Sequence, residues 1–127
     1  MLSIHSVKAA GIVLDELEKA GTFQTCKCIL HWFTGTVSER KRAIDNGALF
    51  SINPKMLRTK SGQETIKAIP EESILLETDA PFTMKYNSLE ELNDELMYMV
   101  EAISDLREQD MYGIIERNSA IIWRETV

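Results

Sequence analysis

The sequence predicts an α/β fold in which parallel strands alternate with helices. Four short apolar runs compatible with strands are each followed by a helix-capping signal or by apolar residues at helical spacing. Two of the runs end in a histidine and the last leads to an aspartate, and parallel α/β folds place their chemistry at these carboxyl ends. At 127 residues, the chain has about half the length of a closed eight-stranded α/β barrel, which needs roughly 250. It therefore corresponds either to a small open sheet or to the latter half of a barrel.

The edges of the sheet favour the half-barrel. An open four-stranded sheet would leave two edges that natural proteins usually cover or charge. No linker, repeat or low-complexity tract interrupts the alternation of strands and helices. We therefore expect residues 1–127 to form a single domain with the architecture of a C-terminal half-barrel of about four βα units.

Two strand–helix units are predicted in the first part of the chain. The first strand is expected over Leu2–His5, with Ser6 placed to cap a helix from Val7 to Ala20. The second strand is expected over Lys27–His31. Its helix should begin at the capping box Thr36–Glu39, because a threonine followed three residues later by glutamate can satisfy two free backbone N–H groups.

Two further units complete the chain. A third strand is expected over Ala48–Ile52, and another capping box, Ser61–Glu64, predicts a short helix. The fourth strand is expected over Ile74–Thr78, and Ser88 with Glu91 caps a long helix after it. A last helix is expected to carry Ile114, Ile115, Ile121, Ile122 and Trp123.

Composition narrows the class of protein. With 44% hydrophobic and 27% charged residues, the chain is typical of a globular domain. It has no run near the roughly 20 apolar residues of a membrane-spanning helix and no secretory signal, so we expect no membrane and a cytoplasmic location. A formal charge of −6 argues against broad electrostatic attraction to nucleic acid. Cys26 and Cys28 lack the CxxC spacing and are interpreted as reduced packing residues, with metal ligation a lesser alternative.

Candidate metal ligands follow three of the strands. His5 and His31 end the first two strands, and Asp79 follows the fourth, so parallel pairing should bring them to one edge of the sheet. Each has a structural alternative: a lone histidine is more often a satisfied polar residue, and Asp79 could be a turn acid before Pro81. Glu77 is interpreted as structural, hydrogen-bonded within the mouth.

The same rim should hold groups that could contact substrate. Lys55, Arg58 and Lys60 follow the third strand and are predicted to bind substrate phosphates, the alternative being a solvated loop. Trp32 and Phe33 could stack on a nucleobase, although aromatic residues just past a strand more often pack in the core.

Four motifs in order carry a resemblance to a known family: HS at 5–6, HWFTG at 31–35, SINP at 51–54 and ETDAP at 77–81. Together they resemble the C-terminal half of TatD-family metal-dependent deoxyribonucleases, which are amidohydrolase-like TIM barrels. The tail IIERNSAIIW, with Asn118, resembles the closing helix of that family. HSVKAA with HWFTG is more similar to the TatD-type nucleases of bacterial Qat anti-phage cassettes.

The resemblance implies a divalent metal ion (zinc, manganese, magnesium or nickel) bound by His5, His31 and Asp79, with DNA as the substrate. It also implies that Asp79 handles the proton of the attacking water. Relatives carry an HxH pair on the first strand of the barrel and a glutamate on the fourth, and a chain that begins at the fifth strand has neither. We therefore expect weak or no activity alone, and association with a second copy or with a complementary N-terminal half. The alternatives are a non-catalytic half-barrel, and a hydrolase of a different ester or of an amide.

Overall fold

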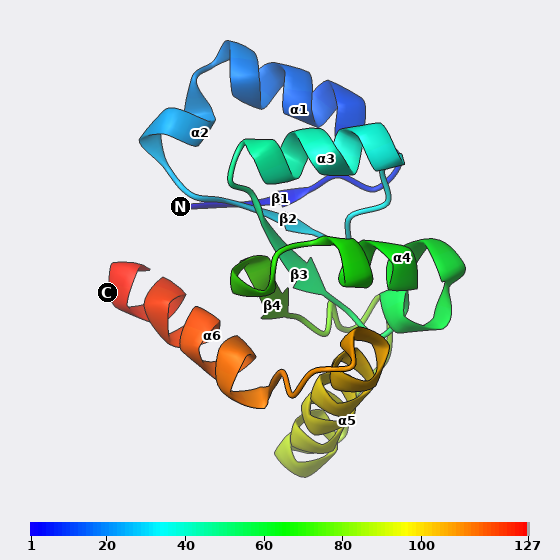
Figure 1. Cartoon of the computed structure of the whole chain (residues 1–127). Coiled ribbons are helices and arrows are strands. Elements are labelled where there is room, and N and C mark those ends of the chain that lie inside the picture. Colours follow the sequence, from blue (N-terminus) through cyan, green and yellow to red (C-terminus); the bar gives the residue numbers. More distant parts are fainter. Residues whose placement is uncertain (127) are drawn as a thin grey trace.

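The computed structural model describes residues 1–126, and within that range it contains one sheet of four parallel strands (Figure 1). The strands are β1 (Leu2–His5), β2 (Cys28–His31), β3 (Leu49–Ile52) and β4 (Ile74–Leu76). They pair in chain order, so β1 and β4 form the two edges. The predicted α/β class and parallel pairing are confirmed.

Helices follow every strand. They are α1 (Ala10–Lys19), α2 (Thr22–Thr25), α3 (Val37–Asp45), α4 (Lys60–Ala68), α5 (Leu89–Arg107) and α6 (Tyr112–Thr126), with 3₁₀ turns η1 (Met56–Arg58) and η2 (Glu71–Ser73). Helices α1 and α3 pack on each other beside β1 and β2, whereas α5 packs on α4 and α6 lies beside β4 (Figure 1). No helix among residues 1–126 has the length and apolar character needed to cross a membrane.

The register of the sheet separates its two faces. One row across the four strands consists of Ile4, Leu30, Phe50 and Ile74. The last three of these are fully buried and join the helices in one hydrophobic core. Successive strand residues point to opposite faces, so the next row lies on the other face. That row consists of His5, His31, Ser51 and Leu75, and it places both histidines side by side at the carboxyl ends of their strands.

The start of α1 differs from the prediction. The helix begins at Ala10 rather than Val7, and Ser6 does not cap it. Ser6 is instead fully buried, and its carbonyl accepts a hydrogen bond from the Ala9 N–H at 3.0 Å. Lys8 has φ +58°, which is the left-handed region and incompatible with a helix passing through it. The turn therefore delays the helix by three residues.

Other boundaries shift for local reasons. Helix α4 is capped by Thr59, whose hydroxyl accepts from the Gly62 N–H at 3.1 Å, so the predicted box at Ser61 is wrong. A Cβ at Gly62 would lie 2.1 Å from the Met56 carbonyl, which shows how closely the chain before α4 packs on it. Strand β4 ends at Leu76, two residues before Thr78. Strand β2 begins one residue later than expected, and the short α2 was not predicted.

The other two predicted N-cap residues, Thr36 and Ser88, are confirmed. Both bonds of the capping box at Thr36 and Glu39 are present at the start of α3. At α5 the Ser88 hydroxyl accepts from the Glu91 N–H, whereas the Glu91 carboxylate reaches the N–H of Asn87 instead of that of Ser88. Both helices therefore begin where the sequence indicates.

Candidate functional site

A pair of histidines stands at the carboxyl ends of β1 and β2. His5 and His31 are register partners, and the Nδ1 atom of His5 lies 3.0 Å from the Nε2 atom of His31. The ring centroids are 4.6 Å apart, with the rings tilted by 54°. One nitrogen of this contact must carry the hydrogen and the other must accept it. The parallel register alone is enough to bring two metal-competent side chains together.

Asp79 lines the same open pocket as the two histidines. The pocket has a volume of about 630 Å³ and is completed by Trp32 and Phe82. Asp79 has φ +53° and is followed by the cis peptide bond between Ala80 and Pro81. Its carbonyl accepts the Phe82 N–H at 2.9 Å. This turn folds the chain back, so that Asp79 and Phe82 both face the pocket.

The described part of the chain nevertheless does not bring together enough side chains to form a complete metal site. Within residues 1–126 there is no group of three or more His, Cys, Asp or Glu side chains placed to hold a metal ion. The chemistry of the donors present still fits a divalent cation, because imidazole suits zinc and nickel, and carboxylate suits manganese and magnesium. The pocket therefore offers part of a coordination shell.

Glu77 is the closest acidic group to the histidine pair. Its Oε2 atom lies 3.4 Å from Nδ1 of His31, on the side of the ring opposite His5. The Ser51 hydroxyl donates to the same oxygen at 2.6 Å, and the Asn53 amide donates to the other oxygen at 3.4 Å. The sequence indicated a hydrogen-bonded Glu77 but not its contact with His31. The signal was present, because Leu75 shares a register row with His31, and Glu77, two residues after Leu75, lies on the same face of the sheet.

Left-handed backbone conformations follow three of the strands, and two of them line the histidine pocket. The non-glycine residues with positive φ in the described chain are Lys8, Trp32, Asp79 and Glu108. The first three follow the ends of β1, β2 and β4 respectively. Such conformations cost about 1–3 kcal/mol each and are found preferentially at functional sites. Trp32, with φ +49°, joins the pocket wall, whereas Phe33 is buried against Phe50, as core packing predicts.

The three basic residues after β3 occupy different places. Lys55 lies at the pocket, because its Nζ atom donates to the Phe82 carbonyl at 3.1 Å and lies 5.4 Å from the centre of the Trp32 ring. Arg58 faces the loop after β4, where its charge opposes the rise that burial causes in the pKa of Tyr86. Lys60 is the first residue of α4. All three side chains are exposed, and only Lys55 approaches the histidine pocket. Their binding of phosphate stays a prediction.

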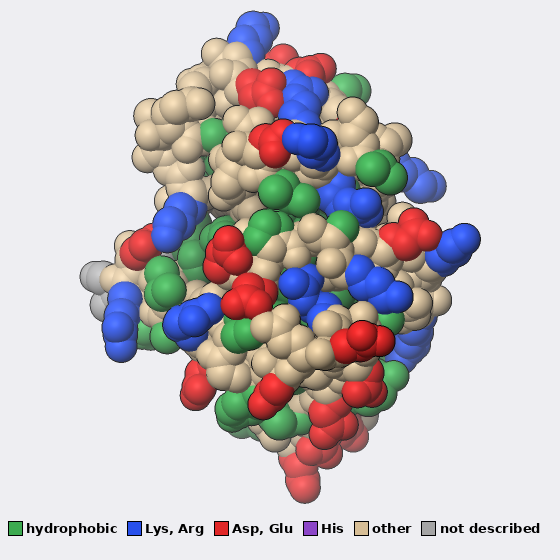
Figure 2. Space-filling view, viewed as in Figure 1, with side chains coloured by type: hydrophobic (Ala, Val, Ile, Leu, Met, Phe, Trp, Pro, Cys, Tyr) green, Lys and Arg blue, Asp and Glu red, His purple; other side chains and the backbone are tan. Residues whose placement is uncertain are grey.

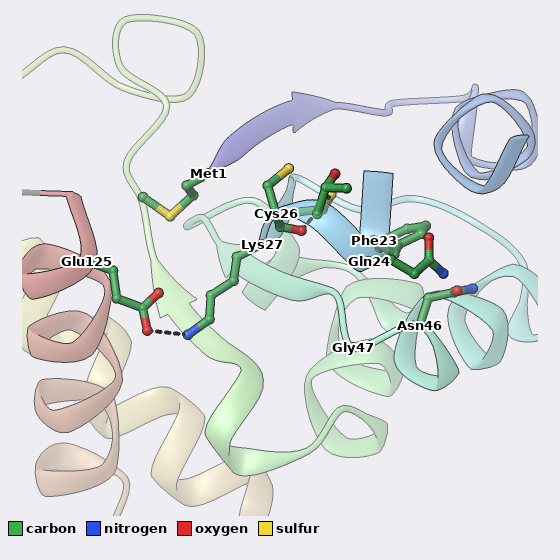
Figure 3. Close-up of a pocket in the computed structure, with 10 residues that line it drawn as sticks. Met1, Phe23, Gln24, Cys26, Lys27, Asn46, Gly47 and Glu125 are labelled. Atoms are coloured by element: carbon green, nitrogen blue, oxygen red, sulfur yellow. Dashed lines mark hydrogen bonds and ion pairs between the residues drawn. The ribbon is translucent and has the colours of Figure 1, made fainter. Parts of the chain in front are cut away.

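A second pocket lies at the other end of β2 (Figure 3). It has a volume of about 450 Å³ and contains both cysteines, beside an ion pair between Lys27 and Glu125 at 2.7 Å. Both thiols are free, and burial raises the pKa of Cys28 to about 11, so this thiol stays protonated. This agrees with the interpretation of the cysteines as reduced packing residues.

Surface charge does not point to broad nucleic-acid binding. On the face shown in Figure 2, basic and acidic side chains are mixed, and acidic side chains gather over α5. This pattern agrees with the net charge of −6.

Comparison with known proteins gives consistent matches. Residues 1–124 match the model of the family described as TatD related DNase. "Deoxyribonuclease Tat-D" of Schizosaccharomyces pombe is 38% identical over 81 residues, which are 64% of this chain and 26% of that protein. "Uncharacterized metal-dependent hydrolase TatD" of Mycobacterium tuberculosis is 32% identical over 109 residues, or 83% of this chain and 40% of that protein.

The fold is also found in a solved structure. A TatD-family hydrolase from Entamoeba histolytica superposes with a TM-score of 0.76 at 17% identity, covering 93% of this chain and 48% of that one. The chain thus spans about half the length of this structure, and between about a quarter and two-fifths of the two curated relatives.

Proposed function

The chain belongs to the family of TatD-related DNases, and from this premise we propose that it takes part in the metal-dependent hydrolysis of phosphodiester bonds in DNA. The observation that carries the proposal is the meeting of His5, His31 and Asp79 at one pocket. The proposal is also supported by the names of two relatives, a deoxyribonuclease and a metal-dependent hydrolase.

Each pocket residue has a role in this proposal. His5 and His31 would hold the divalent cation, with Asp79 as a further ligand from the loop after β4. When bound, the cation would lower the pKa of a water molecule towards 7 and polarise the phosphate. Asp79 takes the proton of the attacking water, and Lys55 binds a phosphate oxygen at the rim of the pocket.

The proposal includes a partner that completes the site. Within the described residues the ligand set is partial. Strand β1 pairs on one side only, and Leu2 is 45% exposed although Cys28, its register partner on β2, is buried. An unpaired strand edge favours association with another chain. We therefore assign the missing ligands to a complementary N-terminal half or, as the alternative, to a second copy of this chain.

A non-catalytic half-barrel is the second candidate function. The absence of a group of three potential ligands among residues 1–126 favours it. In that case the histidine pair would serve only the structure of the sheet edge.

We also place the protein in the cytoplasm, because free thiols such as Cys26 and Cys28 persist in reducing compartments.

Reconstitution tests the two candidates. The chain is assayed with Mn²⁺ on a single-stranded DNA oligonucleotide and on a simple ester, at low and high concentration and with the N-terminal half of a TatD relative added. We expect DNA cleavage near 1 per second or faster only when the half is present, since enzymes typically reach such rates. Rising activity at high concentration of the chain alone would identify a second copy as the partner.

Asp79→Asn should lower the reconstituted rate by at least about 100-fold, because an amide cannot accept the proton. Asp105→Asn is the matched control, since Asp105 is an exposed acid on α5 away from the pocket. Equal rates for Asp79→Asn and the control would contradict the proposal. If only the simple ester is cleaved, the substrate is an ester other than DNA. If nothing is cleaved under any condition, the non-catalytic role is favoured.

A further inference from the structure

The polar group formed by Ser51, Asn53 and Glu77 has no part in the function proposed above. Ser51 is 6% exposed and Asn53 is fully buried, so neither is a surface residue that happens to be polar. Both donate hydrogen bonds to the carboxylate of Glu77. Buried polar groups that converge on one carboxylate fix its position, because each would otherwise remain unpaired at a cost of about 1–3 kcal/mol.

Asn53 is itself held in place. Its side-chain oxygen accepts hydrogen bonds from the backbone N–H groups of Lys55 and Met56 at 3.0 and 3.1 Å. The amide nitrogen is therefore directed towards Glu77, and the amide cannot turn over without losing both bonds. The Glu77 carboxylate thus has little freedom to move away from the ring of His31.

The contacts of His31 distinguish its two tautomers. Its Nδ1 atom faces a Glu77 oxygen at 3.4 Å, and its Nε2 atom faces the Nδ1 atom of His5 at 3.0 Å. A hydrogen on Nδ1 of His31 would be attracted by the carboxylate at this distance, whereas a lone pair there would be repelled by it. The neutral ring therefore carries its hydrogen on Nδ1, and its Nε2 atom accepts the Nδ1 hydrogen of His5.

We propose that Glu77 is a positioning residue, which fixes His31 in the Nδ1–H tautomer and so keeps a lone pair on its Nε2 atom; this lone pair accepts from His5 in the metal-free chain and would bind a divalent cation in place of that hydrogen bond. The metal part of this inference rests on the proposed function. A carboxylate that accepts the second ring N–H of a ligating histidine orients the ring and raises its basicity. Ser51 and Asn53, from the SINP motif, act on His31 through Glu77.

The two histidines make this inference directly measurable, because the chain contains no others. Long-range ¹H–¹⁵N spectra of the histidine-labelled chain are recorded without metal at a pH well above the usual titration range of imidazole. In the wild type, both rings should show a protonated Nδ1 and an unprotonated Nε2. In Glu77→Ala, the Nε2–H tautomer of His31 should appear, because no carboxylate then accepts the Nδ1 hydrogen.

Affinity for zinc gives a second readout. Glu77→Ala should weaken zinc binding by about 10–100-fold, the range typical of lost groups that support a ligand. Glu77→Gln should restore most of the Nδ1–H tautomer, since an amide oxygen can still accept that hydrogen. Glu64→Ala is the matched control, because Glu64 is an exposed glutamate on α4, and it should change neither readout.

The outcomes separate this inference from the proposed function. A wild-type His31 with its hydrogen on Nε2, or a tautomer unchanged in Glu77→Ala, would overturn the role of Glu77. If Glu77→Ala does not fold, the wild-type pattern and Glu77→Gln still decide the question. The predicted tautomers without any zinc binding would contradict the metal site while supporting the positioning of His31 by Glu77.

Discussion

His5 and His31 occupy equivalent positions in two successive strand–helix units, yet the protein holds them very differently. His31 ends β2, an inner strand, and its side chain is 19% exposed with Glu77 behind it. His5 ends the edge strand β1 and is exposed, with His31 as its ring partner. His31 is therefore held in place by buried polar neighbours, whereas the position of His5 depends on what covers the edge of the sheet. Two histidines at equivalent positions of successive strand–helix units can therefore differ in how firmly the protein holds their side chains.

The same contrast should appear most strongly in stability. Leu30 on β2 is fully buried, whereas Leu2 on β1 is 45% exposed. Leu30→Ala should lower the free energy of unfolding by about 2–5 kcal/mol, because it removes buried methyl groups and leaves a cavity. Leu2→Ala, the matched change on the edge strand, should stay within about 0.5 kcal/mol. Urea unfolding of both variants measures the difference.

An equal loss at both positions would break the comparison. It would mean that β1 is covered in solution as fully as β2. Repeating the experiment at several protein concentrations would then show whether a second copy provides the cover, because binding to the folded state makes stability depend on concentration.

A smaller effect concerns the ion pairs between α1 and α3, which join the first strand–helix unit to the second. Arg42 of α3 donates to Glu18 and Asp15 of α1 at 2.6–2.7 Å. The hydrogen bonds from Arg42 hold the pKa of Glu18 below its usual value. A lowered folded-state pKa contributes stability above the unfolded value of about 4.3 and loses it as the pH falls through the folded value. Lowering the pH should therefore weaken the contact between α1 and α3.

Urea unfolding between pH 7 and pH 3 checks this expectation. The wild type should lose more unfolding free energy over this range than Glu18→Gln, which has no charge at position 18 to lose. Glu64→Gln, a change of an exposed glutamate on α4, should follow the wild type. If the unfolding free energies of the wild type and Glu18→Gln fall equally as the pH is lowered, the pair of Arg42 and Glu18 does not stabilise the contact between α1 and α3.

Local signals explain what could be predicted from the sequence. The box at Thr36 and Glu39 is satisfied by residues three apart, so α3 begins where its residues alone indicate. The contact of His5 with His31 follows from two strand ends and parallel register. The family membership follows from the four motifs together. The narrower placement among nucleases of Qat cassettes stays a prediction.

The predictions that were wrong or incomplete depend on backbone conformation and packing, which the identities of the residues do not reveal. Ser6 has the identity of a cap, but the left-handed Lys8 moves the helix start to Ala10. Thr59 replaces Ser61 as a cap because η1 packs directly against Gly62. The contact of Glu77 with His31 joins residues 46 apart in sequence, so it can be inferred only from the register of the parallel strands, which places both side chains on one face of the sheet.

Zinc titration calorimetry on the wild type and three variants tests the central claim, that the two histidines bind a cation and that His31 is the better-organised ligand. We expect the wild type to bind one zinc ion weakly, and His31→Ala to weaken binding beyond the 10–100-fold typical of lost supporting groups. His5→Ala should weaken it less, and Cys26→Ala, which removes a partly exposed thiol, should change nothing. Identical heats for the wild type and His31→Ala would contradict the metal site, and an equal loss in both histidine variants would contradict the difference between them.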